Sequence, residues 1–215
     1  FHSKARKLVF GLILNKKYKM ATSTICAELT EGYDLSCKRN FPKGYYQEAV
    51  FINFNDADKA ASVLGNLAGA TCDYTLQMLL KATKSGVRIK LPDNGSTMKA
   101  FFDKKTNDKG IVEYIHKMQI LAMGVDAETK CKLDKLDHGL YIVAVQSKDN
   151  TIEILGWENG ISTGDYTYDV TDGGGGGIIP LQSKETQAES MLPLVYKPQT
   201  GGNAVADFDS LFEAV

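Results

Sequence analysis

A run of five glycines at residues 173–177 is the feature of this sequence that comes closest to a phosphate-binding loop. Such a loop cradles phosphate oxygens with backbone N–H groups and continues into Gly-Lys-Ser/Thr and a helix. Here Ile178, Ile179 and Pro180 follow the run, and no Gly-x-Gly-x-x-Gly pattern opens a βαβ unit elsewhere. The run therefore predicts a loop between strands.

The cysteines and histidines show no metal-binding pattern. These residues are Cys26, Cys37, Cys72, Cys131, His2, His116 and His138. No two of the cysteines form a Cys-x-x-Cys pair, and no histidine lies at zinc-finger spacing. We expect free or buried thiols, with a Cys26–Cys37 disulfide as the alternative. We expect structural roles for His116, in an apolar strand, and for His138, at a helix end.

Carboxylates and nucleophiles also lack a catalytic or metal-binding motif. Asp165, Asp169 and Asp172 recur in a turn-rich segment, but they do not form the Asp-x-Asp-x-Asp-Gly loop that binds calcium. Glu158 is expected to be an exposed charge in a turn. No serine, cysteine or lysine stands in a nucleophile motif. We predict a protein that is not an enzyme, with no catalytic residues, no metal site and no cofactor.

Composition limits the remaining classes. The chain has 215 residues and a formal net charge of −1, so it has no global basic signal for nucleic acid. No apolar run approaches the roughly 18–20 residues that a membrane span needs, so we expect no membrane partner. The basic stretch at residues 1–19 precedes Met20, which resembles a protein start. We interpret residues 1–19 as an extension, or alternatively as a basic arm that contacts a neighbour or a nucleic acid.

Hydrophobic patterning predicts mostly strands. The predicted strands are residues 49–54, 87–91, 97–102, 111–123, 140–147 and 151–155. Turn residues 92–95 and 148–150 predict two hairpins, each joining the strands on its two sides. Residues 57–70 suggest a short helix or compact loop, because Val63, Leu64 and Leu67 have helical spacing. Residues 103–110 suggest an exposed loop, and residues 74–81 are ambiguous between helix and strand.

One helix is well marked, at about residues 126–138. Asp126 is a good N-cap, and Gly139 is expected to stop the helix. Val125, Leu133 and Leu136 form its apolar stripe. Strands with a single helix predict a mainly β fold, a β-sandwich or barrel with one flanking α-helix and long loops.

Several sequence elements resemble phage tail tube proteins, in particular structural proteins of Bacteroidetes phages and prophages. The resemblance covers residues 26–56 and 111–196. It consists of the hairpin at 140–155, Gly-Trp-Glu-Asn-Gly-Ile at 156–161, the glycine run, Leu-Gln-Ser-Lys-Glu at 181–185 and Leu-Pro-Leu-Val-Tyr at 192–196. Near the start, Cys26-Ala-Glu-Leu-Thr-Glu-Gly32, Cys37 and the strand end Ile52-Asn53-Phe54-Asn55-Asp56 add to it. Residues 57–110 do not match the pattern.

The resemblance implies a tail tube type of β domain at residues 20–196 with a C-terminal arm at 197–215. Tail tube subunits form rings that stack into a tube, so the implied partners are copies of the chain, other tail or head proteins, and DNA that passes without sequence-specific binding. The implied location is the virion tail, after assembly in the bacterial host cytoplasm. A ring would also pair strand edges that are a liability in a monomer.

The residues expected to make assembly contacts lie in three places. They are Gly173, Gly174, Gly175, Trp157, Phe208, Leu211 and Phe212. The last three form an amphipathic end that either docks on a neighbour or packs as a helix on its own subunit. Two other functions stay open: a different virion component, such as a tail terminator, head-completion or capsid decoration protein, and a carbohydrate-binding β-sandwich. The second would use Trp157, Tyr166 and Tyr168 as a stacking platform.

Overall fold

The computed structural model describes residues 44–65, 74–91, 98–169, 171 and 176–213. The interpretations of residues 1–43, including the extension and the Cys26–Cys37 pair, lie outside these residues. Cys72, the turn at 92–95, Asp172 and Gly173, Gly174 and Gly175 lie outside them as well.

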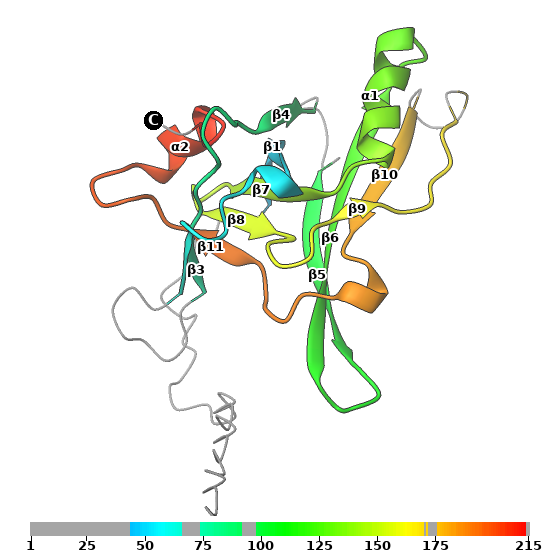
Figure 1. Ribbon diagram of the computed structural model, residues 1–215. Helices are drawn as coiled ribbons and strands as arrows, with labels where there is room; N and C mark the ends of the chain where they lie inside the picture. Colours follow the sequence, from blue (N-terminus) through cyan, green and yellow to red (C-terminus); the bar gives the residue numbers. More distant parts are fainter. Residues whose placement is uncertain (1–43, 66–73, 92–97, 170, 172–175, 214–215) are drawn as a thin grey trace, which may run out of the picture. The chain divides into compact units, whose positions relative to one another are not determined.

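The described strands form two sheets (Figure 1). The seven-stranded sheet has the order β2-β3-β11-β8-β7-β1-β4, and the four-stranded sheet has the order β5-β6-β10-β9. Neighbouring strands are antiparallel except for the parallel pair of β3 and β11. The mainly β fold is confirmed, and the sheets do not close into a barrel.

The strands of the seven-stranded sheet are β1 (Tyr45–Asn53), β2 (Val63–Leu64), β3 (Thr75–Gln77), β4 (Val87–Lys90), β7 (Tyr141–Ser147), β8 (Ile152–Leu155) and β11 (Leu194–Tyr196). Those of the four-stranded sheet are β5 (Lys99–Thr106), β6 (Val112–Met123), β9 (Ser162–Thr163) and β10 (Gly176–Gln182). The helices are α1 (Ala127–Asp137) and α2 (Ala204–Asp209), and two 3-10 turns are η1 (Phe54–Asp56) and η2 (Glu185–Gln187).

The strands β1 and β7 are buried on both faces. Alternate residues such as Phe51 and Val143 pack against the four-stranded sheet, where they meet Met118 and Leu181. The residues between them, such as Ile52, face a second core on the other side of the sheet. A strand that is covered on both faces has a continuous run of apolar residues, and residues 49–52 and 142–145 accordingly contain no polar side chain.

The hairpin of β7 and β8 is confirmed, with its turn at residues 148–150. Asn150 has φ of 67°, a conformation that asparagine tolerates better than most residues. The second predicted hairpin is wrong, because β4 pairs with β1 whereas β5 pairs with β6 in the other sheet. The true partner of β5 is reached through a turn at Asn107, whose side-chain oxygen accepts from Lys109 N (3.0 Å) and Ile111 N (2.9 Å).

The structure also decides three segments that the sequence assigned to loops or left open between alternatives. Residues 103–106 continue β5 instead of forming a loop, because a cross-strand partner compensates for their charges. Of the two expectations for residues 57–70, the described part of that segment bears out the compact loop and not the helix, and Val63 and Leu64 within it form the short strand β2. In the ambiguous segment at 74–81, Thr75–Gln77 is the strand β3.

The flanking helix is confirmed as α1. The Asp126 carboxylate accepts from Thr129 N at 2.8 Å and so caps the helix as expected. Leu136 is buried, but Val125 is 59% exposed and does not belong to the packed stripe. The helix also ends just before Gly139, as expected, with His138 as its C-cap, and a β-carbon at Gly139 would overlap the Tyr141 side chain, so close packing favours glycine here as well.

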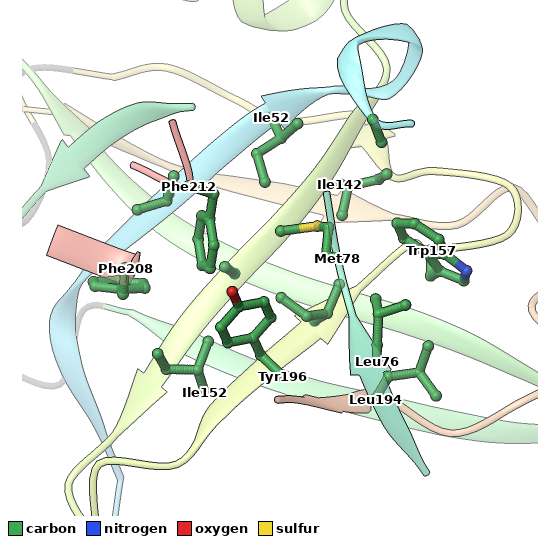
Figure 2. Close-up of a cluster of buried hydrophobic side chains, with 14 of the residues drawn as sticks. Ile52, Leu76, Met78, Ile142, Ile152, Trp157, Leu194, Tyr196, Phe208 and Phe212 are labelled. Carbon is green, nitrogen blue, oxygen red and sulfur yellow. The ribbon is translucent and has the colours of Figure 1, made fainter. Parts of the chain in front are cut away.

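The helix α2 completes the second core. Figure 2 shows Phe208 and Phe212 pointing into the cluster that contains Ile152 and Tyr196. Phe208 is 0% exposed, and its ring contacts Phe212 edge to face at 6.1 Å. Of the two roles expected for the amphipathic end, packing on its own subunit is therefore the one seen.

We expect Phe208→Ala to lower the free energy of unfolding by about 3–5 kcal/mol, because it opens a cavity under the seven-stranded sheet. Urea unfolding at low protein concentration measures the loss. Phe102→Ala is the matched control: Phe102 is 44% exposed, so we expect a loss of about 1 kcal/mol. Equal losses in the two variants would contradict the packing role of α2.

Candidate functional site

Two of the described buried polar side chains, His116 and Glu189, meet at a turn after β8. This turn runs from Gly156 to Gly160, and Gly160 N donates to Gly156 O at 3.0 Å. Both glycines have positive φ, 71° and 79°, and a β-carbon at Gly156 would lie 2.9 Å from Ile161 N. Only glycine meets both demands, so the turn can press against the segment at residues 188–191 and against β6.

His116 joins this turn to both neighbours. Its Nδ1 accepts from Gly156 N at 3.0 Å, so its Nε2 carries the proton and donates to Met191 O at 2.9 Å. The side chain is 1% exposed, and burial lowers the pKa of His116 to about 4. The neutral ring is therefore a fixed cross-link between the four-stranded sheet, the end of β8 and the loop before β11, in agreement with the expected structural role.

Two glutamates link the same two segments reciprocally: each carboxylate accepts hydrogen bonds from the segment that carries the other glutamate. Glu189 accepts from Glu158 N at 2.7 Å and from Asn159 N at 3.0 Å. Glu158 in turn accepts from Ser190 N and Ser190 Oγ, both at 2.6 Å. Burial raises the pKa of Glu189 to about 7, although its two backbone donors act in the opposite direction. Glu158 is half-buried and bonded, so the expectation of an exposed charge is wrong.

Lys59 contacts the Gly156–Gly160 turn from outside the cluster. Its Nζ donates to Glu158 O at 3.0 Å and lies 3.7 Å from the centroid of the Phe54 ring and 5.5 Å from that of Trp157. This arrangement combines a hydrogen bond with cation–π contacts. The cluster therefore uses its ionisable groups to hold three chain segments together.

Trp157, Tyr166 and Tyr168 do not form the expected stacking platform. Trp157 is only 6% exposed and belongs to the second core. Tyr166 and Tyr168 are half-buried against the inter-sheet core, and their hydroxyls donate to Asp137 Oδ2 and Gly124 O.

The residues expected to make assembly contacts are also not gathered on one surface. Trp157, Phe208 and Phe212 are buried in the second core, and Leu211 is half-buried beside them. These side chains are therefore not available to a neighbour in this arrangement. Gly173, Gly174 and Gly175 lie outside the described residues.

The described end of the glycine run has a packing role. A β-carbon at Gly176 would lie 1.9 Å from Ala122 O, and one at Gly177 would lie 2.9 Å from Thr167 O. Gly176 and Gly177 open β10, which pairs with β6 along its whole length. These two glycines allow a close approach of neighbouring backbones. From the sequence alone, this role cannot be distinguished from that of a flexible loop.

The surface that sequence analysis missed is the outer face of the four-stranded sheet, the face turned away from the seven-stranded sheet. Ile178 and Met123 point to it with exposed fractions of 59% and 48%, and Phe101 on β5 is 39% exposed. By their pairing these side chains share one face: Ile178 lies opposite Leu121, Met123 opposite Gly176, and Phe101 opposite Lys117. Exposed large apolar side chains gathered on one face of a sheet are a feature of contact surfaces. The alternating burial of residues along β10 identifies this exposed face only when the pairing of β10 with β6 is known.

Metal ligands are not assembled in the described part of the chain, where no group of three or more His, Cys, Asp or Glu side chains could hold an ion. Asp169 instead accepts from Thr171 N at 2.8 Å. Cys131 is exposed with a free thiol. None of the described helices has the length and apolar character that crossing a membrane requires.

Comparisons with protein-family models, with curated proteins and with solved structures found no significant match.

We expect Gly176→Ala to lower the free energy of unfolding by about 1–3 kcal/mol, because the added methyl group overlaps the β6 backbone. Thermal or urea unfolding measures the change. Gly164→Ala is the matched control, since a β-carbon there would have its nearest neighbour at 3.7 Å, and we expect a change within about 0.5 kcal/mol. A fully tolerated Gly176→Ala would refute the close-approach role.

The two buried ionisable groups should oppose each other in the pH dependence of stability. The folded pKa of His116, about 4, lies below its ordinary value of 6.5, so its stabilising contribution is present above pH 6.5 and is lost as the pH falls through 4. The folded pKa of Glu189, about 7, lies above its ordinary 4.5, so its contribution is present below pH 4.5 and is lost as the pH rises through 7. Between pH 4.5 and 6.5 the two slopes cancel.

Removing either group should unmask the other. We expect the stability of His116→Gln to fall with rising pH in that window, and that of Glu189→Gln to rise, each by about 1.4 kcal/mol per pH unit relative to the wild type. Urea unfolding at a series of pH values measures the slopes. Identical slopes in both variants would show that these groups do not titrate as their burial requires.

Proposed function

We propose that this protein is a self-assembling structural subunit, a tail tube protein of a phage or prophage whose rings stack into a conduit for DNA. The observation that carries the proposal is the open outer face of the four-stranded sheet, with Phe101, Met123 and Ile178 exposed on it. Burying such a face requires a partner of similar shape, and copies of the same chain supply one in a ring or stack.

Two further observations support the proposal. The mainly β fold of two packed sheets with a flanking helix is the architecture that the sequence resemblance implies. The buried ionisable cluster around His116 and Glu189 is committed to cross-links between chain segments, as expected for a rigid building block. The net charge of −1 suits a conduit that lets DNA pass without gripping it.

The test is electron microscopy in negative stain of the purified full chain over a range of concentrations. We expect rings or stacked tubes, and we expect Ile178→Asp to abolish them because it places a charge on the contact face. Val87→Asp is the matched control: Val87 is 61% exposed but lies on β4 of the other sheet, so assembly should persist.

Other outcomes of this experiment are equally informative. A single closed ring that does not stack would favour a tail terminator, head-completion or decoration protein. A chain that forms no ring or tube at any concentration would refute the proposal.

A further inference from the structure

The strand β5 is the longest sheet edge in the described part of the chain. It has eight residues and pairs only with β6, whereas the other edge strands, β2, β4 and β9, have two to four residues. Its two phenylalanines, Phe101 and Phe102, are 39% and 44% exposed. A long edge with exposed aromatic residues is a ready template for another strand.

The pairing of β5 with β6 assigns its side chains to two faces. Ala100 lies opposite Met118, which is 0% exposed in the inter-sheet core, so Ala100 and its alternate neighbour Phe102 point to the inner side. Lys99, Phe101 and Asp103 point to the outer face. Asp103 is 54% exposed while it contacts Lys117 at 2.6 Å.

We propose that the edge of β5 pairs with β5 of a second copy of this chain, antiparallel and two-fold, with Phe101 opposite Phe101. In this register the outer face places Lys99 opposite Asp103 of the second copy, and Asp103 opposite its Lys99. The inner face places the small Ala100 opposite the large Phe102, and the reverse. Residues 99–103 are thus self-complementary in charge and in size on both faces.

Two-fold registers shifted toward the C-terminal end of β5 are less favourable. Shifting the centre to Phe102 sets Lys99 opposite Lys105, and shifting it to Asp103 sets two aspartates against each other. Beside Ala100 there is also an open pocket, lined by Met98, Tyr45 and Gln47, into which the ring of the second copy's Phe102 can reach. The pairing joins two four-stranded sheets into one continuous sheet.

This contact goes beyond the proposed function. A two-fold interface closes on itself, whereas a ring needs contacts between different surfaces of neighbouring subunits. The β5 pairing therefore describes a dimer of the free subunit, and it can stand or fall separately from tube formation.

The first test is a charge swap followed by sedimentation equilibrium of the full chain at about 1–500 µM, which spans the Kd of a small interface. Lys99→Asp and Asp103→Lys should each weaken the dimer about tenfold or more, because each creates like charges twice across the axis. The double variant carrying both changes restores opposite charges and should recover the dimer. Lys109→Asp, in the hairpin tip, is the control and should leave it unchanged.

The second test is cross-linking, which reports the register directly. Residues opposite each other in antiparallel strands have β-carbons about 4.5–5.5 Å apart, so Phe101→Cys should form a covalent dimer on mild oxidation. Lys105→Cys should form no link between the two copies of residue 105, since they would lie about 27 Å apart at 3.4 Å per residue. Mass spectrometry identifies the linked cysteines.

The proposal is overturned if the wild type is monomeric throughout, if the charge variants leave the dimer unchanged, or if Lys105→Cys cross-links as readily as Phe101→Cys. Rings in the microscope without a 101–101 cross-link would refute the dimer alone. A cross-linked dimer without rings or tubes would refute the proposed function alone.

Discussion

Burial of β1 and β7 on both faces is the constraint on which the rest of the structure depends. A strand that is apolar on both sides is stable only when a layer covers each side. The four-stranded sheet covers one side, and α2 packs on the other, together with side chains from β3 and β11 of the same sheet. The removal of either layer would leave Val50 and Ile52, or Ala49 and Phe51, in water. The long-range packing of Phe208 and Met118 follows from that single requirement.

Polar groups fix how these layers meet. Apolar packing has no direction, so it does not by itself set the position of one sheet on the other. His116 supplies direction because both of its ring nitrogens are bonded to backbone groups, those of Gly156 and Met191. Glu189 and Glu158 add reciprocal bonds in the same place. Buried groups of this kind are costly when unpaired, so they favour one arrangement over similar ones.

The sequence predicts local features of the fold well and distant pairings poorly. The helix α1 and the hairpin of β7 and β8 carry their caps and turn residues within a few positions, and both are confirmed. Which strand pairs with β5 depends on how well different strands pair with it, and the turn residues near 92–95 do not determine that choice. In the candidate site, the structural role of His116 was predictable from its apolar strand. The burial of Trp157 and the outer face around Ile178 were not, because they depend on which strands become neighbours.

The covering of the seven-stranded sheet by α2 also sets the order in which the chain can fold. Arg88 and the Phe208 carbonyl that it binds are 120 positions apart, and β3 can pair only after β11, far along the chain, is available. Contacts of such separation must overcome loop-closure entropy before they contribute, so folding is expected to be slow. During synthesis the second core stays open until residue 212 has left the ribosome, with Ile52 and Ile142 exposed in the meantime. The nascent chain is therefore a stronger client for chaperones than the small size of the finished domain suggests.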